Sequence, residues 1–220
     1  MTTTNPSSDY FEKVASQWDD LRAGYFTEAV REVAIRKAYL HPEMTVADVG
    51  AGTGFIAAGL APLVKHVHVL DGSPAMLEVA RRAAKKGGYT NVKFRHGYAE
   101  KLPVKDGEID VIISNCVINL AEDKAKVFAE AYRVLKTGGR LEVNDVVFSG
   151  AVLPEARLSA LGWSECVSGA LPEAEYVDLV KQAGFKDIRV RRSTSSGVSN
   201  DVSVYSVQVS ARKLVSVDKE

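Results

Sequence analysis

The sequence predicts an α/β protein built on a doubly wound, mostly parallel sheet. Five apolar segments of strand length, at residues 45–49, 66–70, 91–95, 108–115 and 140–145, alternate with segments whose apolar residues recur at helical spacing. No internal repeat and no break in composition divides the chain. Because strands that alternate with helices build parallel sheets with helical crossovers, the pattern predicts a single domain of this class.

The composition indicates an ordinary globular protein that acts on a small molecule. The chain has 220 residues, of which 46% are hydrophobic and 25% charged, which is enough for one good core. Lys+Arg and Asp+Glu balance at 28 each, so no charge excess marks nucleic acid or an anionic membrane as a partner. The first residues do not resemble a signal peptide, and no segment reaches the roughly 20 apolar residues of a membrane span. We therefore expect a cytoplasmic protein.

Cysteine and histidine are sparse. Cys116 and Cys166 are the two cysteines, too few for a disulfide scaffold, and we expect both to be reduced and available for chemistry. His66 and His68 alternate in a predicted strand and lack the spacing of a metal site. We expect no metal.

The first strand, at residues 45–49, follows a segment from residue 10 to residue 40 that is expected to form two helices. It passes directly into a turn with glycines at 50, 52 and 54. Glycine adopts backbone angles closed to other residues and lets a ligand approach the main chain. A P-loop would need Lys-Ser/Thr after the last glycine, where this chain has Phe55 and Ile56. A dinucleotide turn would place its third glycine one residue later, so NAD is the second choice.

The second strand, at residues 66–70, ends in Asp71, Gly72 and Ser73, before a helix over 75–86 that has a proline at its start. An acidic residue at this strand end, roughly 20 residues after the glycine turn, is placed to accept both ribose hydroxyls of a nucleoside. Asp71 would otherwise cap the helix, a role that Ser73 can fill instead.

The next strand ends point to the same place. The third strand, at 91–95, leads to Ala99, and the fourth, at 108–115, ends at Asn115 and Cys116. A helix over 123–136, expected to stop at residues 137–139, precedes the fifth strand at 140–145. Ligands of parallel sheets lie at the carboxyl ends of the strands, so the Gly50 turn, Asp71, Ala99 and the Asn115–Cys116 pair are expected to converge on one edge.

The last part of the chain is expected to close the sheet. Beyond residue 150, helical segments end at the Ala183-Gly184-Phe185 signal. Two β-rich segments follow, at 186–192 and 202–212, separated by a Ser/Gly loop over 193–201. They would form an antiparallel hairpin at the sheet edge and bring the sheet to seven strands.

Motifs along the chain resemble known methyltransferases. The run D-V-G-A-G-T-G-F, residues 48–55, is similar to the first motif of class I methyltransferases that use S-adenosylmethionine. Residues 112–120, 128–141 and 163–176 resemble the arsenite methyltransferase family, and the similarity extends from about Thr45 to about Val190. The resemblance implies a Rossmann-like sheet and S-adenosylmethionine as cofactor. It also implies a helical lid at 1–44, a cofactor-binding core at 45–146, a substrate-side insertion at 147–183 and closing strands at 184–214.

The resemblance also implies the cofactor site. Tyr10 and Trp18 would cover the ligand, and Ala99 and Glu100 would lie against the adenine. The full expected set is Tyr10, Trp18, Asp48, Gly50, Ala51, Gly52, Gly54, Phe55, Asp71, Gly72, Ser73, Met76, Tyr98, Ala99, Glu100, Asn115, Cys116 and Val117.

Cys116 and Cys166 fall in the two segments where the arsenite methyltransferases place arsenic-binding cysteines. Trivalent arsenic is soft and is held by thiolates, and its lone pair can attack a sulfonium methyl group without a general base. The two thiolates are the expected catalytic residues, with hydroxide or an external thiol as the third arsenic ligand. The family's further N-terminal cysteine is missing, which favours a later methylation over the first methylation of arsenite.

Two other functions remain open from the residues. The segment from Asp9 to Asp19 is more similar to quinone and other small-molecule methyltransferases, which would have a base near the cofactor methyl group. A non-catalytic module that binds arsenite or an adenosyl ligand is the third possibility.

Overall fold

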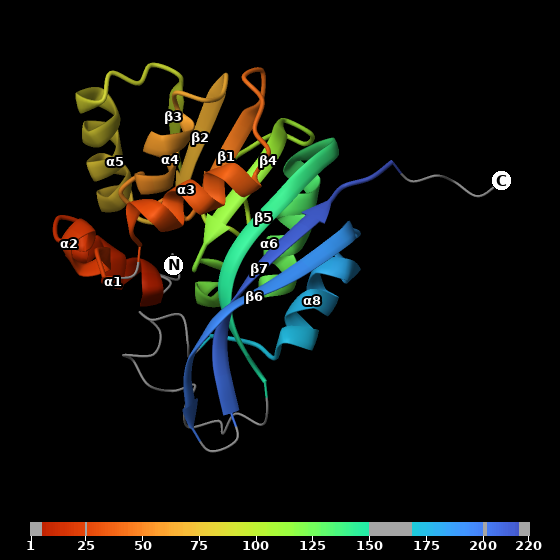
Figure 1. Cartoon of the computed structure of the whole chain (residues 1–220). Coiled ribbons are helices and arrows are strands. Elements are labelled where there is room, and N and C mark those ends of the chain that lie inside the picture. Colours follow the sequence, from red (N-terminus) through yellow and green to blue (C-terminus); the bar gives the residue numbers. More distant parts are fainter. Residues whose placement is uncertain (1–5, 25, 150–168, 200–201, 216–220) are drawn as a thin grey trace, which may run out of the picture.

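A computed structural model describes residues 6–24, 26–149, 169–199 and 202–215, and shows one sheet of seven strands with helices on both faces (Figure 1). The strand order is β3-β2-β1-β4-β5-β7-β6; β1 to β5 run parallel, and β7 runs antiparallel to β5 and β6. The strands are β1 (Thr45–Val49), β2 (His66–Asp71), β3 (Val92–His96), β4 (Ile109–Asn115), β5 (Leu135–Ser149), β6 (Lys186–Ser199) and β7 (Val202–Arg212). The predicted fold class, including the antiparallel edge hairpin, is confirmed.

The helices are α1 (Pro6–Val14), α2 (Trp18–Arg22), α3 (Glu28–Lys37), α4 (Phe55–Leu60), α5 (Pro74–Lys86), α6 (Lys124–Val134) and α8 (Glu173–Gln182), with a 3₁₀ turn η1 (Ile118–Leu120). The N-terminal segment holds three helices, where two were expected, because the chain turns at residues 15–17 and again at Ala23 and Gly24. Glycine is a poor helix former, which explains the second break. Within the described residues, no helix combines the length and apolar character that crossing a membrane requires.

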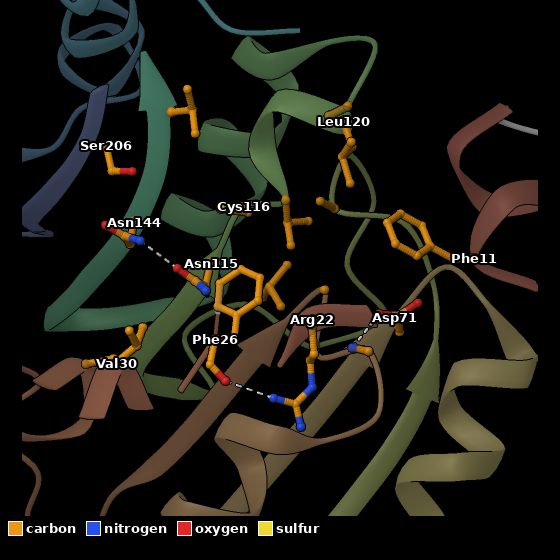
Figure 2. Close-up of a pocket in the computed structure, with 18 of the residues that line it drawn as sticks. Phe11, Arg22, Phe26, Val30, Asp71, Asn115, Cys116, Leu120, Asn144 and Ser206 are labelled. Atoms are coloured by element: carbon orange, nitrogen blue, oxygen red, sulfur yellow. Dashed lines mark hydrogen bonds between the residues drawn. The ribbon is translucent and has the colours of Figure 1, made fainter. Parts of the chain in front are cut away.

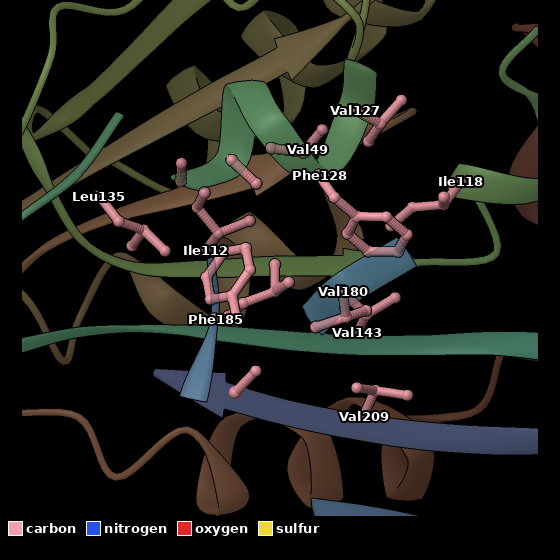
Figure 3. Close-up of a cluster of buried hydrophobic side chains, with 14 of the residues drawn as sticks. Val49, Ile112, Ile118, Val127, Phe128, Leu135, Val143, Val180, Phe185 and Val209 are labelled. Atoms are coloured by element: carbon pink, nitrogen blue, oxygen red, sulfur yellow. The ribbon is translucent and has the colours of Figure 1, made fainter. Parts of the chain in front are cut away.

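Alternate residues of the central strands supply two hydrophobic cores, one on each face of the sheet. Val46 and Val111 join the core with α4 and α5, whereas Val49 and Ile112 join the core with α6 and α8. Figure 3 shows the second core, in which Phe128 lies among strand residues. The near-continuous apolar runs in β1 and β4 follow from burial on both faces. The strands whose carboxyl ends carry the site are thus packed on both faces.

Helix α6 ends at Val134 and β5 begins at Leu135, so the expected stop at residues 137–139 is wrong. Leu135 pairs with Ile109, and the N–H of Gly138 donates to the carbonyl of Lys213 at 2.6 Å, which draws this segment into the sheet. The Lys213 Nζ donates to the carbonyls of Tyr132 and Leu135, both at 2.8 Å, and so places a cation at the end of the helix.

Residues 193–199 of the expected Ser/Gly loop belong to β6, which continues to Ser199, so the loop prediction is wrong for this part. Ser195 pairs with Tyr205 and Ser199 pairs with Val202, and the register shifts on both sides of Ser195. Irregular pairing of this kind is common in edge strands, and β6 is the edge of this sheet.

A substitution of Phe128 can test the packing of the core beneath the site. We expect Phe128→Ala to lower the free energy of unfolding by about 3–5 kcal/mol, because Phe128 is fully buried and packs edge-on against Tyr176. Urea denaturation measures the loss. Leu63→Ala, at a side chain that is 45% exposed, is the control and should cost less than about 1 kcal/mol. Equal losses for the two variants would contradict the packing described.

Candidate active site

A cleft of about 1320 Å³ opens at the carboxyl ends of the parallel strands (Figure 2). Its walls come from the N-terminal helices, the glycine turn after β1, the ends of β2 and β4, and the C-terminal strands. Most of the residues expected at the cofactor site line this cleft: Tyr10, Trp18, Gly50, Gly52, Asp71, Gly72, Ser73, Met76, Tyr98, Ala99, Glu100, Asn115, Cys116 and Val117. The topology thus brings together segments spread over more than a hundred residues.

Four expected residues lie outside this cleft. Asp48, Ala51 and Phe55 line an adjoining cavity of about 80 Å³ beneath the N-terminal helices. Gly54 is the N-cap of α4, with φ +82°, and a Cβ there would lie 3.1 Å from the Cβ of Ala80. Burial raises the pKa of Asp48 to about 7.

The glycine turn is tied to its neighbours through its backbone. The N–H groups of Gly50 and Ala51 both donate to the carbonyl of Leu70, at 2.8 and 3.1 Å. Gly50 has φ +69°, and a Cβ at this position would lie 2.2 Å from Cγ2 of Val117. Both the backbone angle and the lack of space require glycine here, so the turn presents bare main chain to the cleft.

Asp71 ends β2 inside the cleft. Its Oδ2 accepts the N–H of Gly52 and its Oδ1 accepts the N–H of Ser73, both at 2.8 Å. Burial raises the pKa of this carboxyl, and the two backbone donors partly offset the shift. Ser73 caps α5 by accepting the N–H of Met76 at 3.2 Å. Asp71 is therefore not needed as the cap, and each of its oxygens keeps a further lone pair for a ligand hydroxyl.

The N-terminal helices are fastened over the glycine turn. Glu12 accepts hydrogen bonds from the Ser73 hydroxyl at 3.1 Å and from the N–H of Ala75 at 3.3 Å. Asp19 accepts one from the Thr53 hydroxyl at 2.6 Å. The Nε1 atom of Trp18 would lie 3.5 Å from a Cβ at Gly52. Helices α1 and α2 thereby form one wall of the cleft, which we call its roof.

Aromatic and cationic side chains complete this roof. Phe11 packs edge-on against Tyr10 and Trp18, with ring centroids 5.3 and 5.1 Å apart. The Arg22 guanidinium lies 3.8 Å from the centroid of the Phe55 ring, a cation–π contact. Phe55 therefore supports the roof rather than facing the large cleft.

The loop after β3 forms the wall beside Gly72. The ring of Tyr98 packs on Gly72, where a Cβ would lie 3.0 Å from it, and Glu100 accepts the N–H of Glu122 at 3.1 Å. Arg133 anchors this loop by donating to the carbonyls of Val104 and Leu102, at 3.0 and 3.1 Å. Ala99 and Glu100 are held at the cleft by these contacts.

Cys116 lies between β4 and η1 and lines the cleft. Its φ is +56°, an uncommon value for a residue other than glycine, and its N–H donates to the carbonyl of Asn144 at 2.8 Å. The Asn144 side chain donates to Oδ1 of Asn115 at 2.7 Å, as Figure 2 shows. Cys166, the second expected catalytic residue, falls outside the described residues.

A buried acid lies behind the segment that carries Cys116. The Tyr176 hydroxyl donates to Oδ2 of Asp145 at 3.1 Å, and both side chains have no exposed surface. Burial raises the pKa of Asp145 to about 7, with the Tyr176 hydrogen bond opposing the shift. The pKa of Tyr176 is raised by its burial and by the nearby Asp145 and Cys116. Asn119, which donates to the carbonyl of Val146 at 2.6 Å, ties the same segment to β5.

Comparison with known proteins gives a consistent result. Residues 40–184 match the family described as a methyltransferase domain. A solved arsenic(III) S-adenosylmethionine methyltransferase from Chlamydomonas reinhardtii superposes with a TM-score of 0.71 at 30% identity, over 83% of this chain and 70% of that one. The chain belongs to the S-adenosylmethionine-dependent methyltransferases. The expected cofactor is confirmed at the level of this family.

The curated relatives of this methyltransferase include arsenite methyltransferases and hydroquinone methyltransferases. The arsenite methyltransferase of Halobacterium salinarum is 36% identical over 70% of this chain, and a 2-methyl-6-phytyl-1,4-hydroquinone methyltransferase of Arabidopsis thaliana is 37% identical over 78% of it. The chain spans 40% and 49% of the length of these two proteins. The resemblance to arsenite methyltransferases is confirmed.

The chain's own residues fit an adenosyl cofactor. The turn at Gly50 has no room for a Cβ, and Asp71 retains acceptor capacity at the end of the next strand. Sequence reasoning missed Phe11, Arg22, Phe26 and Asn144, which also line the cleft of the methyltransferase. Phe11 lies on α1 and Trp18 on α2, so the turn between these helices decides their contact, and Arg22 and Asn144 carry no local signal either.

Asp71 tests the cofactor half of the cleft. We expect Asp71→Ala to weaken binding of S-adenosylhomocysteine by about tenfold to a hundredfold in a calorimetric titration, since hydrogen bonds to a charged acceptor contribute roughly 1.5–3 kcal/mol. Glu32→Ala removes an exposed carboxylate from α3 and should leave the affinity within twofold. Unchanged affinity in Asp71→Ala would remove this residue from the cofactor site.

The raised pKa of the buried Asp145 predicts a pH dependence of stability, which a substitution of this residue can test. Its pKa is raised in the folded protein from 3.8 to about 7, so the stability it contributes is full below about pH 4 and is lost as the pH rises through 7. Between pH 5 and pH 8 the free energy of unfolding should therefore fall in the wild type, and Asp145→Asn should lack this part of the fall. We expect the two falls, measured by urea denaturation, to differ by roughly 2 kcal/mol. Asp178→Asn, on the surface, is the control. Parallel pH profiles for wild type and Asp145→Asn would contradict the assignment.

Proposed function

We propose that this methyltransferase transfers a methyl group from S-adenosylmethionine to a trivalent arsenical held by the Cys116 and Cys166 thiolates. The observation that carries the proposal is the position of Cys116, which lines the same cleft as the Gly50 turn and Asp71. Thiolates suit a soft centre such as trivalent arsenic. The similarity to arsenic methyltransferases in sequence and structure supports the same substrate class.

The cofactor half of the cleft would bind and orient the adenosyl group. The bare backbone at Gly50 and Gly52 would lie along it, Asp71 would accept its ribose hydroxyls, and Ala99 and Glu100 would face its adenine. Tyr10 and Trp18, on the fastened N-terminal helices, would exclude water. Residues 1–44 would accordingly act as the lid, 45–146 as the cofactor-binding core, 147–183 as the substrate-side segment and 184–214 as the closing strands.

Bound S-adenosylmethionine supplies an electrophilic methyl group on a sulfonium. The arsenic lone pair would form the new As–C bond while the C–S bond breaks and its electron pair stays on sulfur, so no proton has to move. The role of Cys116 is then to hold arsenic at attack distance. Such positioning can contribute about 7–11 kcal/mol to lowering a barrier. An external thiol or hydroxide would complete the arsenic coordination.

An organic acceptor is the second candidate, and one observation favours it. The cleft extends beyond Cys116 along α3 and the C-terminal strands, through space that a small arsenical would leave unfilled. The hydroquinone methyltransferase of Arabidopsis thaliana, 37% identical, is consistent with this alternative. A binding module without turnover, the third candidate, would bind cofactor tightly and transfer no methyl group to either substrate.

The cysteines provide the test. We expect Cys116→Ser and Cys166→Ser each to lower transfer of labelled methyl from S-adenosylmethionine to methylarsonous acid by at least about a hundredfold, because each removes one soft ligand. Affinity for S-adenosylhomocysteine should stay within a few-fold. Leu63→Ser, a surface change, is the control and should retain full transfer. Label transfer that survives both cysteine substitutions would overturn the thiol mechanism, and transfer to a hydroquinone alone would favour the second candidate.

A further inference from the structure

The cleft is larger than one ligand requires. Pockets for single drug-sized ligands usually measure about 300–1,000 Å³, whereas this cleft measures about 1320 Å³. Beyond the cofactor half, it continues between α3 on one side and β5, β7 and β6 on the other. We call this continuation the acceptor channel. The described residues that line it are Phe26, Ala29, Val30, Val33, Ala34, Lys37, Asn144, Val146, Arg191, Arg192, Val204, Ser206 and Gln208.

The α3 wall of the acceptor channel is apolar. Val30, Val33 and Ala34 are spaced so that they share one face of α3, and Phe26, just before the helix, lines the channel beside them. None of the α3 residues is buried, and Val30 is 37% exposed. In Figure 2, Phe26 and Val30 point toward Asn115 and Asn144 across the channel. This stripe is suited to an apolar ligand surface.

The opposite wall carries a row of polar side chains across four strands. Asn115 pairs with Asn144, Asn144 with Gln208, and Gln208 with Arg191. The row therefore runs from the end of β4, beside Cys116, to the edge strand β6. The next row of the same wall contains Val146 opposite Ser206. A ligand along this wall would contact hydrogen-bonding side chains in the first row, and one apolar and one polar side chain in the second.

The far end of the row is cationic. Lys37, on α3, donates to Oε1 of Gln208 at 2.5 Å. Gln208 is paired with Arg191 on the neighbouring strand, so both cations belong to this end of the row. Arg192 is neutralised by Glu173, at 2.7 Å. No carboxylate occurs among the described residues that line the acceptor channel.

One carboxylate lies close to this end of the row. Glu142 occupies the preceding row of the same face, is 5% exposed, and accepts the Ser210 hydroxyl at 2.8 Å. It lies within electrostatic range of three cations, Lys37, Arg140 and Arg212. The balance of charge at this end therefore remains positive.

We propose that the acceptor channel binds an organic anion, with the apolar body of the ligand along the α3 stripe and its negative group at Lys37 and Arg191. This deepens the methyl transfer proposed above, on which it rests for its place in the reaction, by naming the chemical class of the ligand next to Cys116. The apolar stripe and Lys37 belong to the α3 wall and Arg191 to the opposite wall of one channel, so a single amphiphilic molecule can contact all of them. A neutral polar ligand would leave Lys37 and Arg191 unused, and a cation would be repelled.

The test uses two fluorescent probes that differ in charge. The anion 8-anilinonaphthalene-1-sulfonate and its neutral analogue N-phenyl-1-naphthylamine are titrated into the full chain saturated with S-adenosylhomocysteine, so that the cofactor half is filled. We expect Lys37→Gln and Arg191→Gln each to weaken binding of the anionic probe by about tenfold, the loss of one charge-assisted contact. Binding of the neutral probe should stay within twofold.

Two further variants complete the design. Val33→Asn places an amide on the apolar stripe and should weaken both probes. Arg189→Gln removes a cation from the same strand that does not line the channel, and should change neither. The proposal is overturned if the anionic probe binds equally to wild type, Lys37→Gln and Arg191→Gln, or if Arg189→Gln weakens it as much as they do. These binding ratios do not depend on turnover. If the protein transferred no methyl group but bound the probes with the expected ratios, the proposed function would be wrong and the proposed anion site would stand.

Discussion

Gly50 lies against the side chain of Val117 with no space for a Cβ, and the arrangement of the site depends on this contact. It joins the turn after β1 to the segment after β4. The Ser114 hydroxyl strengthens the junction by donating to the carbonyl of Val49 at 3.0 Å, and the N–H groups of Gly50 and Ala51 connect the turn to Leu70. Three strand ends are thereby fixed relative to one another, which places Asp71 and Cys116 on opposite sides of one turn.

The roof of the cleft is held by contacts with this turn and with the loop after β2. Glu12 and Asp19 accept hydrogen bonds from residues of the two ligand-facing loops, and Arg22 stacks on Phe55 just after the glycines. Ser73, the partner of Glu12, lines the cleft itself, whereas Thr53 and Phe55 line the small adjoining cavity. The N-terminal helices are therefore anchored to the glycine turn and to the loop after β2.

The acceptor side has a different character from the cofactor side. Around Cys116 the segment after β4 is hydrogen-bonded to β5 through the carbonyl of Asn144 and through Asn119, and the buried Asp145–Tyr176 pair lies behind it. Beyond it, the channel opens toward an apolar helix face and two cations. A thiol that holds a soft atom and a channel that holds an organic anion are compatible, because they occupy successive parts of one cleft.

The sequence by itself determined the parallel α/β sheet, the glycine turn, the strand ends and the residues that line the cofactor half of the cleft. These features follow from local patterns: apolar runs of strand length, glycines that need unusual backbone angles, and polar residues directly after buried strands. Tertiary structure alone decided that β5 begins at Leu135 and that β6 continues through the Ser/Gly-rich residues to Ser199, because strand pairing outweighs local turn preference. It also decided that Phe55 supports the roof, and that Lys37 donates to Gln208, the strand partner of Arg191. Those contacts join residues far apart in the chain, and no local pattern encodes which distant partner a side chain will meet.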